Sequence, residues 1–197
     1  MMNAFSTRYD QALQFAAHAH RQQFRKGTHI PYIAHVVHVS VILLRHGFDE
    51  DVAIAGLLHD VVEDCDVPLA QLEAQFGTDV ARLVDAVSEI KHTGGAARSW
   101  EERKAEKIAH LHQGGPRVAA LKAADALHNV HSIIADMALI GPEVWRRFKR
   151  GPEPTLWYYR AILAGVQAHL GSHPIAAELA TAVDELEHTI ERYNAPA

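Results

Sequence analysis

The sequence predicts an all-α fold, a single-domain helical bundle. Apolar residues recur at helical spacing along most of the chain, and Gly or Pro interrupts the pattern where a helix would end or begin. No alternating apolar and polar run is long enough to predict a strand. The 197 residues, 48% of them hydrophobic, suffice for one sizeable core but not for two. We therefore expect one domain over residues 1–197.

The N-terminal half is predicted to form five helices. Gly27 and Gly47 end the first two, and Asp49 caps the third, with two further acidic residues in its first turn. Pro68 opens the fourth and Thr78 caps the fifth. These helices cover about residues 7–25, 33–46, 50–64, 68–77 and 79–90.

The C-terminal half continues after an exposed loop at residues 91–99. Ser99 and Glu102 form a capping-box pattern that opens the next helix, and the Gly-Gly-Pro segment at 114–116 separates it from a longer one. A Gly-Pro pair at 141–142 ends that long helix. The predicted helices cover about residues 99–111, 117–139, 144–148, 156–170 and 174–193.

Composition limits the compartment and the partners. The only cysteine, Cys65, excludes an internal disulfide and fits a reducing cytoplasm. We find neither a signal peptide nor an apolar run of membrane-spanning length. The net charge of −5 argues against nucleic acid or an anionic membrane as the main partner. The sequence leaves the oligomeric state open.

The segment LLHDVVED at residues 57–64 places one imidazole and three carboxylates directly after an apolar run. Ionisable groups at the edge of a core cost several kcal/mol unless they are paired. Acidic residues at a helix C-terminus also have the wrong sign for the helix dipole. A cation is therefore expected close to His59, Asp60, Glu63 and Asp64.

Two more polar residues lie among apolar neighbours, His35 in YIAHVVHV and Asp125 in LKAADALHN. With His59 and Asp60 they would give two imidazoles and two carboxylates, a set suited to Mn, Fe, Zn or Mg. Four ligands leave coordination positions open, as a catalytic metal requires. The alternatives are a hydrogen-bonded core histidine at position 35 and a simple pair between Asp125 and Lys122.

The motifs YIAH, LLHDVVED and LKAADALHN, in this order, resemble those of the metal-dependent HD phosphohydrolases. The resemblance is strongest to the hydrolase domain of the RelA/SpoT alarmone enzymes and to the small stand-alone alarmone hydrolases, over residues 24–136. It implies that His35, His59, Asp60 and Asp125 hold a divalent metal, typically Mn²⁺.

The same resemblance implies that Glu63 and Asp64 orient and deprotonate the attacking water or supply the leaving group with a proton. The metal would acidify the water while a carboxylate within reach takes its proton. Repulsion between the two carboxylates would raise at least one pKa, which allows acid and base roles in one site.

The substrate-binding residues implied by the resemblance are basic, polar and aromatic. Each also has a simpler interpretation, as a solvated helix end, a helix contact or core packing. Trp157 is a further candidate for a wall of the base pocket, whereas Arg103 and Lys104 are interpreted as exposed partners of neighbouring glutamates. The substrate-binding candidates are Arg25, Lys26, Asn129, Ser132 and Tyr158.

The chain departs from the long RelA/SpoT enzymes, which usually have basic residues where it has Ala126, His131 and Glu89. The lost basic groups put the substrate, more than the chemistry, in doubt. Because the chain ends before a synthetase domain could begin and has no α/β pattern to build one, we expect a hydrolase only, which removes the 3′-pyrophosphate of guanosine tetra- or pentaphosphate to give GDP or GTP. One alternative is the same metal chemistry on an adenosine alarmone, NADPH or a nucleoside monophosphate. Another is a sensor that binds metal or nucleotide without turnover.

Overall fold

The protein is described by a computed structural model that covers residues 6–89, 92–93, 96–148 and 150–194. The predicted all-α fold is confirmed, whereas the single domain stays a prediction. Among the described residues, no helix is long and apolar enough to cross a membrane. The helices are α1 (Thr7–Ala19), α2 (Ile33–Arg45), α3 (Glu50–Leu58), α4 (Val61–Asp64), α5 (Leu69–Phe76), α6 (Thr78–Val87), α7 (Trp100–Ile140), α8 (Pro152–Leu170) and α9 (Pro174–Asn194), with a 3-10 helix η1 (Gly141–Arg147).

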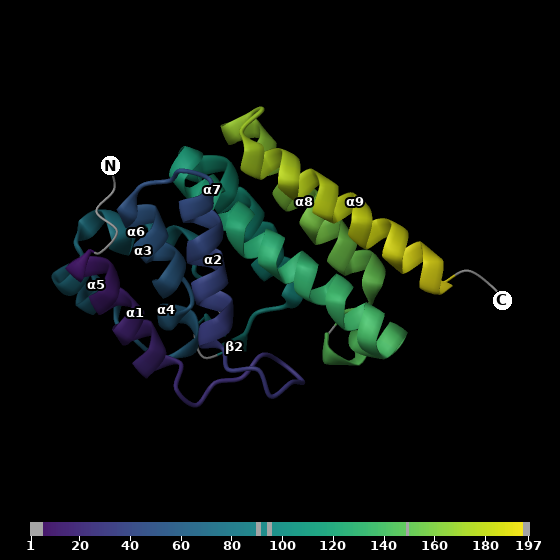
Figure 1. Ribbon diagram of the computed structural model, residues 1–197, viewed down its shortest axis with the longest axis horizontal. Coiled ribbons are helices and arrows are strands. Elements are labelled where there is room, and N and C mark those ends of the chain that lie inside the picture. The colour runs from purple at the N-terminus through teal and green to yellow at the C-terminus, as the bar shows by residue number, and fades with distance from the viewer. Residues whose placement is uncertain (1–5, 90–91, 94–95, 149, 195–197) are drawn as a thin grey trace.

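Helix α7 runs through the middle of the molecule (Figure 1). It packs against α2, α3 and α6 on one side and against α8 and α9 on the other. The apolar faces of these helices share one hydrophobic cluster, which includes Leu57, Leu121 and Ile162. Helices α2, α3 and α7 therefore pack into one common core.

Several predicted helix boundaries are confirmed by their capping contacts. Ser99 Oγ accepts a hydrogen bond from the Glu102 N–H, and the Glu102 carboxylate accepts one from the Ser99 N–H. Asp49 Oδ1 accepts from the Val52 N–H at 3.1 Å at the start of α3. The predicted break near residue 115 is a kink inside α7, where Gly115 has φ 77°. One cap is wrong: Thr78 is the first residue of α6, and Gly77 is its N-cap.

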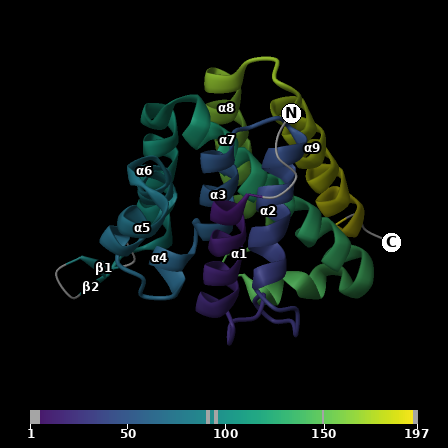
Figure 2. The same ribbon diagram turned by 60° about the vertical axis from the view of Figure 1, so that its left-hand side comes forward.

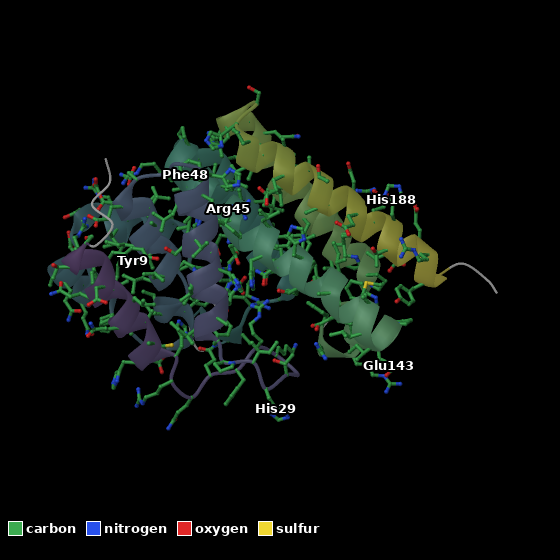
Figure 3. The ribbon with its side chains drawn as sticks, in the orientation of Figure 1. Tyr9, His29, Arg45, Phe48, Glu143 and His188 are labelled. Atoms are coloured by element: carbon green, nitrogen blue, oxygen red, sulfur yellow. The ribbon has the colours of Figure 1, made fainter. Side chains whose placement is uncertain are left out.

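The first helix ends at Ala19, six residues earlier than predicted. Residues 20–32 instead form turns, with the Arg25 N–H donating to the Ile30 carbonyl at 2.8 Å and the Tyr32 N–H donating to the Gln23 carbonyl at 2.9 Å. Phe24, which lies in this turn, is 53% exposed. Figure 3 places His29 at the tip of this connection, pointing away from the helices. The turn brings Arg25 and Tyr32 toward α7.

The segment LLHDVVED does not end one helix but spans two. Helix α3 ends at Leu58, and α4 begins at Val61, so His59 and Asp60 lie at the junction. Helix α3 also approaches α2 closely at Gly56, where an added Cβ would lie 2.8 Å from Leu43 Cδ1. The missing side chain lets the two helices that carry His35 and His59 pack together.

Two further differences lie outside the core. The loop predicted at residues 91–99 contains a short antiparallel pair, β1 (His92–Thr93) and β2 (Ala96–Ala97), at the edge of the molecule in Figure 2. Helix α8 starts at Pro152 rather than at 156, because proline is well tolerated in the first turn of a helix.

Candidate active site

Four predicted residues come together where α2, the α3–α4 junction and α7 meet. One ligand atom each of His35, His59 and Asp125 lies within 4.8 Å of the others. Asp60 joins them, with its Oδ2 3.0 Å from His59 Nε2 and 3.7 Å from His35 Nε2. We call His35, His59, Asp60 and Asp125 the His/Asp cluster. That it binds a metal stays a prediction.

The surroundings of the cluster hold its atoms in ligand positions. His59 Nδ1 lies 2.9 Å from the Gly56 carbonyl, so this nitrogen carries the proton and donates it. The other nitrogen, Nε2, is buried and faces two carboxylates, with Asp60 Oδ2 at 3.0 Å and Asp125 Oδ1 at 3.8 Å. The Tyr32 hydroxyl donates to Asp60 at 2.7 Å, and the Asn129 amide donates to Asp125 at 2.6 Å. A buried imidazole nitrogen that faces two carboxylate oxygens is a donor set that fits a divalent metal.

The electrostatics of the His/Asp cluster favour added positive charge. Burial raises the pKa of Asp60, but His59 and His35 lower it more strongly, so this carboxyl stays ionised. Burial likewise raises the pKa of Asp125, and Lys122, 3.3 Å away, together with His35 lowers it well below its usual range. Burial lowers the pKa of His59, yet Asp60 and Asp125 raise it to about 9. Without a metal, the cluster therefore holds a proton that a divalent cation would replace.

The two predicted catalytic carboxylates have different partners. Glu63 Oε2 accepts the Glu89 N–H at 3.0 Å and lies 3.2 Å from Lys107 Nζ. Asp64 Oδ2 accepts from the Gln23 amide at 3.0 Å. Both carboxylates line a cavity of about 190 Å³ that also contains Asp60 and Asp125. Glu63 and Asp64 therefore share one cavity with the two carboxylates of the His/Asp cluster.

The basic residues of α7 are placed differently from the prediction. Arg103 and Lys104 are mostly buried and pair with Glu89, whose side chain is 2% exposed, rather than with glutamates of their own helix. Lys107 Nζ lies 3.4 Å from the same carboxylate. Burial raises the pKa of Glu89, but Lys107 and Lys104 outweigh that effect and lower it to about 2. We call Glu63, Glu89, Arg103, Lys104 and Lys107 the ion-pair cluster.

The predicted substrate residues line two adjoining cavities. Arg25, Asn129 and Tyr158 line the 190 Å³ cavity, and Arg25 donates to Asn129 Oδ1 at 2.7 Å. Lys26 and Ser132 line a second cavity of about 500 Å³, of which Arg25 and Asn129 are also part. Trp157 lines neither cavity and is 51% exposed.

Sequence reasoning missed several residues of this site. Tyr32, Lys104 and Lys107 line the 190 Å³ cavity, and His128 lines the larger one. The sequence offers no spacing signal for the lysines, because their partner Glu89 lies in a different element. The polar pattern LHN, next to Asp125, is the one signal that points to His128.

Comparisons with known proteins agree with this geometry. The family model of the HD domain matches residues 12–150. The chain is 35% identical over 170 residues to guanosine-3′,5′-bis(diphosphate) 3′-pyrophosphohydrolase MESH1 of Drosophila melanogaster. This match covers 84% of this chain and 89% of the relative. It is also 39% identical over 142 residues to a probable guanosine-3′,5′-bis(diphosphate) 3′-pyrophosphohydrolase of Synechocystis. That match covers 71% of this chain and 18% of the relative.

Two solved structures share the fold. One is described as a metazoan orthologue of SpoT that hydrolyses ppGpp and plays a role in starvation responses; it superposes with a TM-score of 0.74 at 30% identity, covering 95% of this chain and 98% of that one. The other is lmo0812 from Listeria monocytogenes, with a TM-score of 0.69 at 38% identity, covering 76% of this chain and 96% of that one.

Proposed function

The chain belongs to the HD domain family, and on that basis we propose that it hydrolyses the 3′-pyrophosphate of guanosine tetra- or pentaphosphate, giving GDP or GTP and pyrophosphate. The observation that carries the proposal is the His/Asp cluster beside the two adjoining cavities, one polar and one large enough for a nucleoside. We also propose Mn²⁺ as the metal, a free nucleotide as the substrate, the cytoplasm as the compartment and one domain as the working unit.

The charges of the smaller cavity support a pyrophosphate ligand. Its lining contains four carboxylates and four cationic side chains, which balance one another when the histidines are neutral. A bound divalent cation would leave a net charge of about +2, and it would act as a Lewis acid toward the phosphate and the water. The cationic side chains are Arg25, Lys104, Lys107 and Lys122.

The roles of the carboxylates follow from their places in the cavity. In the proposed reaction a water oxygen forms a bond to the phosphorus attached to the 3′ oxygen, and the bond from that phosphorus to the 3′ oxygen breaks. Glu63 takes the proton of the water, and either Glu63 or Asp64 returns a proton to the 3′ oxygen. Lys107 and the Glu89 N–H hold the Glu63 carboxylate in place.

A hydrolysis panel tests the proposal. The purified protein, with Mn²⁺, is incubated with ppGpp, pppGpp, ppApp, NADPH and GMP, and the products are identified. We expect GDP and pyrophosphate from ppGpp, and no product after chelation. Intact ppGpp would refute the proposed reaction, and turnover of another compound would name the substrate instead.

The variant Glu63→Gln separates an enzyme from a sensor. It should abolish hydrolysis while the metal content stays that of the wild type, because the substitution removes a base and no proposed ligand. Wild-type protein that binds ppGpp and Mn²⁺ without turning ppGpp over would favour the sensor.

A further inference from the structure

Three histidines form a hydrogen-bonded row between α2 and α7. His35 Nδ1 lies 2.8 Å from His128 Nδ1, and His128 Nε2 lies 3.1 Å from His38 Nδ1. His35 is 1% exposed, His128 is half-buried and His38 is exposed, so the row leads from the His/Asp cluster to the surface. No reaction step proposed above uses His128 or His38.

The hydrogen bonds fix the proton positions along this row. His35 Nε2 faces Asp125 and Asp60, at 3.4 and 3.7 Å, and a nitrogen that binds a metal carries no proton. The His35 proton is then on Nδ1, which donates to His128 Nδ1. His128 must carry its own proton on Nε2, which donates to His38 Nδ1. When all three imidazoles are neutral, these hydrogen bonds therefore allow only one tautomer for each ring.

The two histidines of the His/Asp cluster are therefore held in different ways. His59 donates to the Gly56 carbonyl, a backbone group of its own helix that no substitution removes. His35 donates to a side chain that lies 93 residues away in the sequence. The orientation of His35 consequently depends on the packing of α2 against α7 and on the identity of residue 128.

We infer that His128, supported by His38, is a positioning residue that fixes the tautomer and ring orientation of His35 for binding the metal. This inference rests on the metal site of the proposed function. His128 and His38 also line the 500 Å³ cavity, so the row joins the wall of the proposed nucleoside site to the proposed metal site. His128 itself is expected to bind no metal.

Mn²⁺ binding by the metal-free protein, measured by titration calorimetry, tests this inference without using activity. His128→Leu removes the acceptor and leaves the buried His35 N–H unpaired, so we expect Kd to rise about 10- to 100-fold. His128→Asn keeps an acceptor oxygen near the Nδ1 position and should stay within about fivefold of wild type. His38→Leu should have a small effect, because water can replace an exposed partner.

His131→Leu is the matched control, since His131 is an exposed histidine of the same helix outside both cavities. Wild-type Mn²⁺ affinity in a folded His128→Leu protein would overturn the inference. If that variant fails to fold, as judged by circular dichroism, the comparison of His128→Asn with His128→Ala decides, and equal affinities would overturn the inference.

Failure of the proposed function gives a different result. Wild-type protein that binds Mn²⁺ but leaves ppGpp intact refutes the reaction, and the role of His128 is still decided by the binding series. Wild-type protein that hydrolyses ppGpp, with His128→Leu equal to it in affinity, refutes only the role of His128. Wild-type protein that binds no Mn²⁺ overturns both.

Discussion

The His/Asp cluster and the ion-pair cluster both bury carboxylates beside one cavity, but they balance the charge differently. In the ion-pair cluster, Glu63 and Glu89 face three cationic side chains of α7. In the His/Asp cluster, the two carboxylates face the imidazoles of His35 and His59, and Lys122 is the lysine that pairs with Asp125. The first arrangement is complete within the described chain, whereas the second accommodates a cation from outside.

This difference separates function from stability. Substitutions in the His/Asp cluster should remove activity and the response to metal, because the chain supplies only part of that site. Substitutions in the ion-pair cluster, apart from those of the proposed base Glu63, should lower the free energy of unfolding, because they leave a buried charge without its partner.

The largest effect is expected for Asp125→Asn. The loss of one proposed ligand charge should lower kcat/KM for ppGpp about 10⁴-fold, or roughly 5 kcal/mol of transition-state stabilisation. The variant should also lose the stabilisation expected for the wild type from Mn²⁺, which is about 2.7 kcal/mol at a metal concentration 100 times Kd and is seen as a rise in Tm. Thermal scans with and without Mn²⁺ check this. A variant that keeps both responses would contradict the assignment of Asp125.

A substitution in the ion-pair cluster, Lys107→Met, should act on the fold. Glu63 then loses its lysine while both side chains are 13% exposed, and we expect the free energy of unfolding to fall by about 3 kcal/mol. Urea denaturation of the metal-free protein measures this fall. In the double variant with Glu89→Gln the loss should be smaller than the sum of the two single losses. Strictly additive losses would show that Lys107 and Glu89 do not interact.

The ion-pair cluster also predicts how stability depends on pH. The pKa of Glu89 is about 2 in the folded protein and ordinary, near 4.5, in the unfolded chain, so its contribution is present above pH 4.5 and is lost as the pH falls toward 2. Between pH 5 and 3 the loss should be about 2 kcal/mol. Glu89→Gln should lack this part of the acid destabilisation. Urea denaturation of the wild type and of Glu89→Gln at pH 5 and pH 3 tests this prediction. An equal loss of unfolding free energy between the two pH values in both proteins would contradict it.

The sequence predicted the His/Asp cluster but not the ion-pair cluster, for a physical reason. His35 and Asp125 are polar residues inside apolar helix faces, a conflict that can be seen along the chain without a structure. Lys104 follows Glu101 by three residues and Arg103 precedes Glu106 by three, and this spacing predicts pairs within one helix. Their actual partner, Glu89, lies just beyond α6, and only the packing of α6 on α7 brings it close.

Helix ends limited the prediction in the same way. The turn after Ala19 is held by backbone hydrogen bonds among residues 20–32, and no cap signal in the sequence marks the end of α1 at that point. The break after Leu58 likewise has no Gly or Pro to mark it. Both turns carry site residues, Arg25 and Asp60, so the least predictable backbone lies where the site is built.

The smallest effect is expected for Ser132, which lies outside both clusters and whose hydroxyl already donates a hydrogen bond within its own helix. Ser132 Oγ donates to the His128 carbonyl of its own helix at 2.8 Å, although it also lines the 500 Å³ cavity. Ser132→Ala should change KM for ppGpp less than about twofold, and unfolding by less than about 0.5 kcal/mol, since such bonds add little to a helix. A tenfold higher KM with unchanged kcat would instead mean that the hydroxyl contacts the substrate.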